Sequence, residues 1–184
     1  MNKKQEQLYL DELSTLCNFV VYACQDYCAS NLGSRLNYPA DRLWYYLQNI
    51  VTYTADISKI LWGSDPASNN DRKKFRKLLN ITEDSPLQSK KFRNLLEHID
   101  INLRKFSKKD IQILRNKNIT SSDHDIFVGN KAFIPRNENT LRNYDISRQE
   151  FVIFGRTFQM QPIIISVLNL RDRVKEVQNE NLDC

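Results

Sequence analysis

The chain has 184 residues, of which 41% are hydrophobic and four are glycine, and its formal net charge is +5. This composition excludes a disordered chain and fits one domain with a sizeable core. The two most apolar segments, 13–29 and 43–62, are interrupted by polar and charged residues, so neither offers the roughly 20 apolar residues that a membrane helix needs. The amino-terminal residues lack the pattern of a signal peptide. We therefore expect a cytoplasmic protein without a membrane partner.

The positive charge is concentrated in the middle of the chain. Residues 1–71 carry five Lys or Arg against eight Asp or Glu, residues 72–117 carry fourteen against five, and residues 118–184 carry eight against nine. A segment with a charge of +9 suits a phosphate polymer, whereas the usual explanation of a charge run is a solvated helix face. The candidate RNA-binding residues in this segment are Lys73, Lys74, Arg76, Lys90, Lys91 and Arg104.

Helical periodicity predicts that most of the chain is helical. We expect helices over residues 6–30 and 39–62, followed by a short basic helix that is capped by Asn70 or Asp71 and ends at residue 79. A further helix opens at Ser89, and residues 107–118 form another short helix or its continuation. The helix that opens at Ser89 should direct one apolar stripe to the core. The stripe consists of Phe92, Leu95, Leu96, Ile99, Leu103 and Phe106.

The pattern changes after residue 121. Residues 125–134, 141–144, 150–154 and 156–158 look extended, with turn signals at Gly129-Asn130 and at Gly155. A last helix is expected over residues 162–178. The predicted fold is mainly α: an antiparallel helical bundle with a small antiparallel β-hairpin or meander before the last helix. We predict one domain, 1–184, with a β-rich insert at 121–160.

The cysteines and the second histidine do not predict a metal site. Cys17, Cys24 and Cys28 lie seven and four residues apart on one predicted helix face, no CxxC pair occurs, and buried free thiols explain them best. His124 lies in a turn rich in capping residues, where a local hydrogen bond is the usual outcome. We expect no metal and no cofactor.

Arg93, Asn94 and His98 form an Arg-Asn-x-x-x-His motif inside the basic segment. His and Arg can move protons and stabilise charge at a phosphodiester without a metal. In a helix Asn94 and His98 lie one turn apart on the same side, and Arg93 lies about 140° around the axis from His98. Arg93 can then meet a histidine only near the helix start or across a dimer interface. The alternative is an ordinary ion pair of Arg93 with Glu97 beside a solvated histidine.

Residues 92–100, FRNLLEHID, resemble the signature of HEPN domains, which are small helical modules often found in RNA-cutting toxins and defence proteins. The resemblance implies a metal-independent endoribonuclease whose site forms where two motifs meet in a homodimer, in a toxin or antiphage effector. It implies that His98 acts as general acid or base, that Arg93 stabilises the charged phosphorane, and that Asn94 orients the phosphate or His98. An antitoxin or inhibitor protein is a further implied partner. Asp100 stands where some of these toxins carry a tyrosine that a partner enzyme modifies, so that route of silencing is in doubt.

Two alternatives stay open beside the ribonuclease. The first is a HEPN-like module that has lost catalysis and binds RNA, a nucleotide or a partner protein. The second is a helical interaction protein in which the motif is accidental. RNA binding without cleavage would select the first, and a monomer without affinity for RNA would favour the second.

Overall fold

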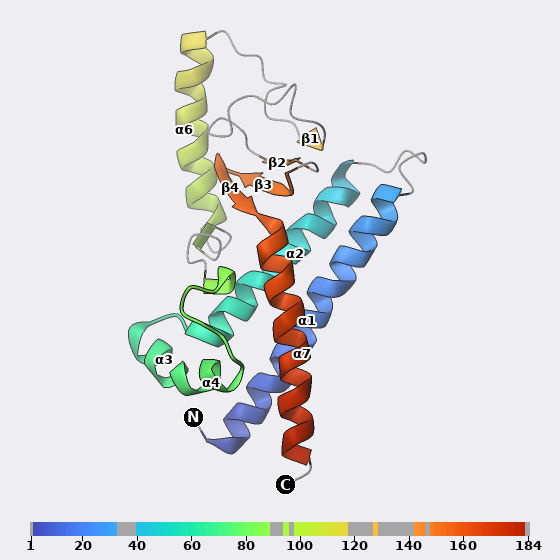
Figure 1. The fold of residues 1–184 in the computed structure, drawn as a ribbon. Helices are drawn as coiled ribbons and strands as arrows, with labels where there is room; N and C mark the ends of the chain where they lie inside the picture. The colour runs from blue at the N-terminus through green and yellow to red at the C-terminus, as the bar shows by residue number, and fades with distance from the viewer. Residues whose placement is uncertain are drawn as a thin grey trace.

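A computed structural model describes residues 2–32, 40–88, 94–95, 98–117, 127–128, 142–145 and 148–182 (Figure 1). Helices account for most of these residues, and a small sheet precedes the last helix, as the sequence predicts. The elements are α1 Lys3–Leu32, α2 Ala40–Trp62, α3 Pro66–Asp71, α4 Lys73–Leu78, the 3-10 helix η1 Pro86–Gln88, α6 Ile99–Lys117, β1 Phe127–Val128, β2 Arg142–Asp145, β3 Glu150–Ile153, β4 Arg156–Gln159 and α7 Met160–Leu182.

Three long helices form the body of the molecule. α1 and α2 run antiparallel to each other, and α7 packs along α1 (Figure 1). Each helix buries residues three or four apart, because that spacing places them on one face. In α7 this set is Ile163, Val167, Leu170, Val174 and Val177, all at most 6% exposed. This buried face directs α7 toward the core that it shares with α1.

The sheet has the order β1-β2-β3-β4. β2, β3 and β4 form the predicted antiparallel meander, whereas the short β1 pairs with β2 in parallel. Phe154 and Gly155 connect β3 to β4 with φ of 49° and 73°, and two successive positive φ values are typical of a type I′ hairpin turn. The Phe151 ring stacks on Trp44 of α2, with centroids 5.1 Å apart and planes 10° apart, so this contact attaches the sheet to the body.

The short basic helix that we expected after α2 is α4, but an additional short helix, α3, precedes it. Gly63 ends α2 with φ of +70°, and an added Cβ would lie 2.4 Å from the Cβ of Ser68. Asp65 caps α3 by accepting the backbone N–H of Ser68 at 3.0 Å, and the Ser68 hydroxyl donates to the same carboxylate. The hydroxyl bond first, and then the backbone bond, lower the pKa of Asp65. Asn70 and Asp71 lie within α3, so the prediction that one of them caps the basic helix was wrong. Arg72 precedes α4 and makes no side-chain cap.

Candidate functional site

Asn94 and His98 lie at the amino-terminal end of α6. Both are exposed, and the backbone N–H of His98 donates to the carbonyl of Asn94 at 3.3 Å. The next such bond joins the N–H of Asn102 to the carbonyl of His98 at 2.9 Å. These two bonds have the spacing of an α-helix, so the one-turn relation of Asn94 and His98 holds although α6 begins after His98. Arg93 lies outside the described residues.

The Asn102 side chain secures this turn, a role that the sequence analysis missed. Its Nδ2 donates to the carbonyl of Leu95 at 3.2 Å and to that of His98 at 2.9 Å. Leu95 is 1% exposed and anchors the turn in the core. An amide four residues after His98 was the available signal, because that spacing places it on the same side of a helix.

For the RNA cleavage that the HEPN resemblance implies, we expect Asn102→Ala to lower the rate about tenfold with little change in the melting temperature, because misplacing a reacting group costs rate rather than global stability. Initial cleavage rates and thermal unfolding of both proteins measure the two effects. Asn102→Asp is the control of equal size, because aspartate keeps the shape of the asparagine side chain but lacks its amide N–H donors. An unchanged rate in Asn102→Ala would remove this positioning role.

The apolar stripe predicted for this region is only partly buried. Leu95 and Phe106 are 1% and 7% exposed, as expected, but Ile99 and Leu103 are 38% and 44% exposed. The exposed part of the stripe therefore lies on the first two turns of α6. Phe92 and Leu96 lie outside the residues whose side chains the structure describes. The prediction of a wholly core-facing stripe was wrong at Ile99 and Leu103.

The cations of α6 differ in their position relative to His98. Arg104, Lys105 and Lys108 are all exposed. By helical geometry Lys105, seven residues after His98, lies within about 20° of it around the axis, and Arg104 lies about 120° away. Lys105 therefore shares the face of His98, and Arg104, the residue that we selected, does not. The i,i+7 spacing was the signal that could have identified Lys105.

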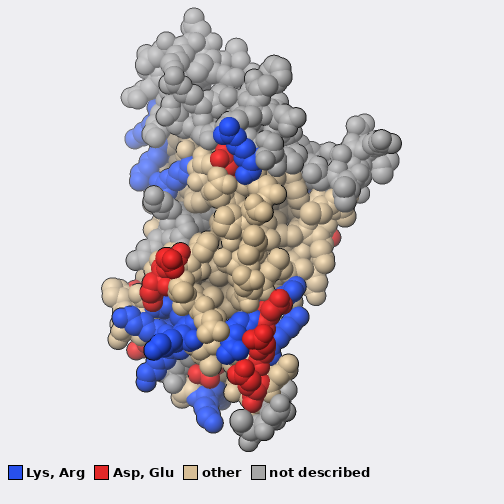
Figure 2. Space-filling view, viewed as in Figure 1, with Lys and Arg blue, Asp and Glu red and all other residues tan. Residues whose placement is uncertain are grey.

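The basic segment forms more than one surface. Lys73 and Lys74 are exposed on α4, and Figure 1 shows α4 apart from α6. Figure 2 shows two separate groups of Lys and Arg, one over α3 and α4 and one over α6. Lys90 and Lys91 lie outside the described residues. The structure therefore does not bring Lys73 and Lys74 next to His98.

Arg76 is not part of a surface for RNA. Its side chain is 1% exposed and forms an ion pair with Glu83 at 2.6 Å. Nη1 also donates to the carbonyls of Leu61 at 2.7 Å and of Asn69 at 3.3 Å, and the guanidinium lies 5.4 Å from the centroid of the Trp62 ring. These contacts use the guanidinium to join α2, α3 and the segment after α4. Selecting Arg76 as an RNA-binding residue was therefore wrong.

The ion pair predicts a dependence of stability on pH. The hydrogen bond from Arg76 is the largest cause that lowers the pKa of Glu83 below its ordinary value of 4.5. The stabilisation by the ionised carboxylate is therefore present above that ordinary value and is lost as the pH falls through the lowered pKa. We expect the free energies of unfolding of wild type and Glu83→Gln to differ more at pH 7 than at pH 3. Urea denaturation at both pH values measures this, and an equal difference would refute it.

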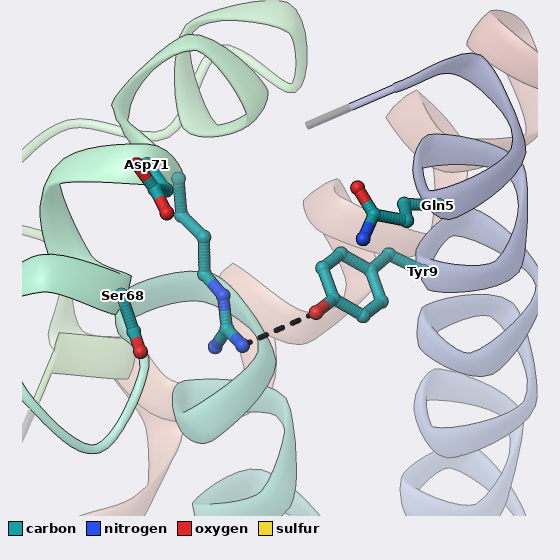
Figure 3. A pocket seen from close by; sticks show the side chains of 5 residues that line it. Gln5, Tyr9, Ser68 and Asp71 are labelled. Carbon is teal, nitrogen blue, oxygen red and sulfur yellow. Dashed lines mark hydrogen bonds between the residues drawn. The ribbon is translucent and has the colours of Figure 1, made fainter.

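A polar pocket of about 160 Å³ lies between α1 and α3. Gln5 and Tyr9 reach from α1 toward Ser68 and Asp71 (Figure 3). Arg72, the fifth lining residue, donates to the hydroxyl of Tyr9 at 3.3 Å and to the carbonyl of Lys59. Because the guanidinium of Arg72 already donates to these two acceptors, we interpret the pocket as a structural junction between α1, α2 and α3.

The described cysteines are free thiols. Burial raises the pKa of Cys17 to about 12 and that of Cys24 to about 11. Cys28 is exposed, which the expectation of three buried thiols did not include. Within the described residues, no group of three or more His, Cys, Asp or Glu side chains is placed to hold a metal ion. His124 lies outside these residues.

Comparison with known proteins returns no match. No family model, no curated protein and no solved structure matches the chain. Among the described helices, none is both long enough and apolar enough to cross a membrane.

Proposed function

We propose that this protein is a metal-independent endoribonuclease that acts as a homodimer. The observation that carries the proposal is the exposed pair of Asn94 and His98, which lies one helical turn apart at the start of a helix with exposed cations. Lys105 lies on the same face of that helix as His98. An imidazole beside a cationic surface fits acid–base chemistry on a phosphodiester.

The proposed reaction uses the ribose 2′-hydroxyl as the nucleophile. His98 takes the proton of this hydroxyl or gives one to the departing 5′-oxygen, and the products are a 2′,3′-cyclic phosphate and a 5′-hydroxyl. Asn94 orients the phosphate or His98. Arg93, by the resemblance to HEPN domains, stabilises the negative charge of the phosphorane. DNA lacks the 2′-hydroxyl, so it is not a substrate.

The exposed apolar side of α6 supports association of two copies near the motif. Ile99 and Leu103 lie one turn apart directly after His98, and both are more than a third exposed. Burying such side chains against a second copy removes apolar surface from water. The dimer would then bring two motifs together, as the HEPN resemblance implies. A role as a toxin or antiphage effector, an inhibitor protein and a cytoplasmic location stay predictions.

The test is RNA cleavage by the pure protein in EDTA. An end-labelled structured RNA is incubated with the protein, and the product ends are analysed for a 2′,3′-cyclic phosphate. Cleavage with this end supports the proposal. Specific RNA binding without cleavage would instead select a catalytically inactive RNA-binding module, and neither binding nor cleavage would favour a protein-interaction role.

Lys105 and Arg104 offer a matched pair for RNA affinity. We expect Lys105→Ala to weaken RNA binding more than Arg104→Ala does, because Lys105 lies on the face of His98. Loss of one phosphate contact should also reduce the slope of the logarithm of the binding constant against the logarithm of the salt concentration by about one. Filter binding at several salt concentrations measures both quantities. Equal losses in the two variants would contradict the placement of RNA on this face.

A further inference from the structure

A second, aromatic groove of about 160 Å³ lies between α1 and α2. Three of its aromatic side chains are largely open to solvent: Phe19 is 40% exposed, Tyr22 57% and Tyr45 61%. Exposed aromatic rings gathered around one concavity are unusual on a surface without a partner, since each ring is costly to hydrate. The lining residues are Phe19, Tyr22, Ala23, Asp26, Tyr45, Tyr46, Asn49 and Tyr53.

The rings of this groove are set at an angle to one another. Phe19 and Tyr53 have centroids 5.1 Å apart and planes inclined by 51°. Tyr45 and Tyr46 have centroids 5.5 Å apart and planes inclined by 62°. Inclined rings do not form one flat stacking surface of the kind that a planar base would cover. The geometry therefore favours a rounded ligand over a flat one.

The charge of the groove favours a cation. Asp26 contributes a carboxylate, and among the lining residues that the structure describes there is no lysine or arginine. Arg42 does not line the groove. Its Nε donates to the hydroxyl of Tyr46 at 3.0 Å. Residues 1–71, which supply both helices, carry a net charge of −3. An anionic phosphate has no cationic partner in this lining.

We propose that this groove binds an organic ammonium cation, either as a small molecule or as a lysine side chain of another protein. The cation would lie over the faces of Tyr22 and Tyr45, with Asp26 as its counter-ion. Cation–π attraction from several rings together with one carboxylate is the chemistry by which proteins recognise alkylammonium groups. The inference does not depend on the ribonuclease, because none of these residues belongs to the motif or to α6.

Choline and its neutral isostere, 3,3-dimethylbutan-1-ol, test whether the groove recognises positive charge. The two compounds have the same shape, and only the quaternary nitrogen of choline is replaced by carbon. We expect choline to bind about tenfold more tightly, with NMR shift changes centred on residues of the groove. Equal affinities would overturn the proposal, since the groove would then be merely apolar. Tighter binding of adenosine monophosphate than of choline would also overturn it, in favour of base stacking.

Variants at exposed positions keep the test independent of folding. Tyr45→Leu should weaken choline binding at least threefold, and Tyr45→Phe should retain it, because the ring face and not the hydroxyl makes the contact. Asp26→Asn should weaken binding and Arg42→Gln should strengthen it. Leu8→Ala, a 64% exposed residue away from the groove, is the control. Equal binding by all variants would refute the assigned site.

A second ligand distinguishes a free ammonium compound from a lysine side chain of another protein. N-acetyl-lysine methylamide binds more tightly than choline if the groove takes a protein side chain, and less tightly if it takes a free ammonium compound. Either result supports the cation site. Failure of both compounds to bind at millimolar concentration would overturn it, while RNA cleavage by the same preparation would leave the ribonuclease proposal intact.

Discussion

His98→Ala is expected to lower the rate of RNA cleavage by a factor of roughly 10²–10⁴, the usual contribution of a general acid or base. The imidazole of His98 is exposed, so an RNA substrate can reach it. Because the side chain is exposed, its removal should leave the fold unchanged. Cleavage rates measured under single-turnover conditions give the effect on the chemical step.

The second histidine of the chain is the matched control. His124→Ala removes the same chemical group outside the motif, so it should cleave at the wild-type rate. Thermal unfolding of both variants verifies that the comparison is between folded proteins. If His98→Ala cleaves RNA as fast as His124→Ala, His98 is not catalytic and the observed activity belongs elsewhere.

Arg76→Ala is expected to lower the free energy of unfolding by about 3 kcal/mol, the largest stability effect that we predict. The substitution leaves a cavity beside Trp62 and removes the donors for two backbone carbonyls, those of Leu61 and Asn69. Many domains have only 5–15 kcal/mol of stability, so this loss is substantial. Urea denaturation of the two proteins at pH 7 measures it.

Two controls separate packing from charge at this position. Arg76→Lys keeps the positive charge but loses the planar guanidinium group, so we expect a stability between those of wild type and Arg76→Ala. Glu83→Gln should cost under about 1 kcal/mol, because the carboxylate is 61% exposed and its attraction is screened. A stability of Arg76→Ala within about 0.5 kcal/mol of wild type would contradict the structural role of Arg76.

The long helices were predictable because their burial follows a local rule. In α7, Ile163, Val167 and Leu170 repeat with helical spacing, and each is at most 6% exposed. The additional helix α3 was less accessible from the sequence, since Gly63 and Asp65 mark both the end of α2 and the start of the next helix. Such signals locate a boundary without saying how the chain continues.

The role of Arg76 could not be predicted from charge along the chain. Its partners lie on other elements: Leu61 is 15 residues before it and Glu83 is seven residues after it. The exposure of Ile99 and Leu103 likewise depends on where α6 stands relative to the body. Sequence periodicity identifies an apolar face, but only the tertiary arrangement decides what covers that face.

The local part of the candidate site was more accessible. The one-turn relation of Asn94 and His98 followed from their spacing and is confirmed by the backbone bond between them. The same spacing rule applied to His98 would have found Asn102 and Lys105. Arg93 lies outside the described residues, so its expected approach to a histidine across a dimer stays a prediction.

The proposed mechanism requires the 2′-hydroxyl of RNA as the nucleophile, and a single modified substrate is sufficient to test this requirement. After the cleavage position is mapped in EDTA, the same RNA is synthesised with a single 2′-deoxynucleotide on the 5′ side of the cleaved bond. We expect cleavage at that bond to disappear while cleavage elsewhere continues. Cleavage of the modified bond at the unmodified rate would contradict the proposed mechanism, since attack by water or by the protein would then be required.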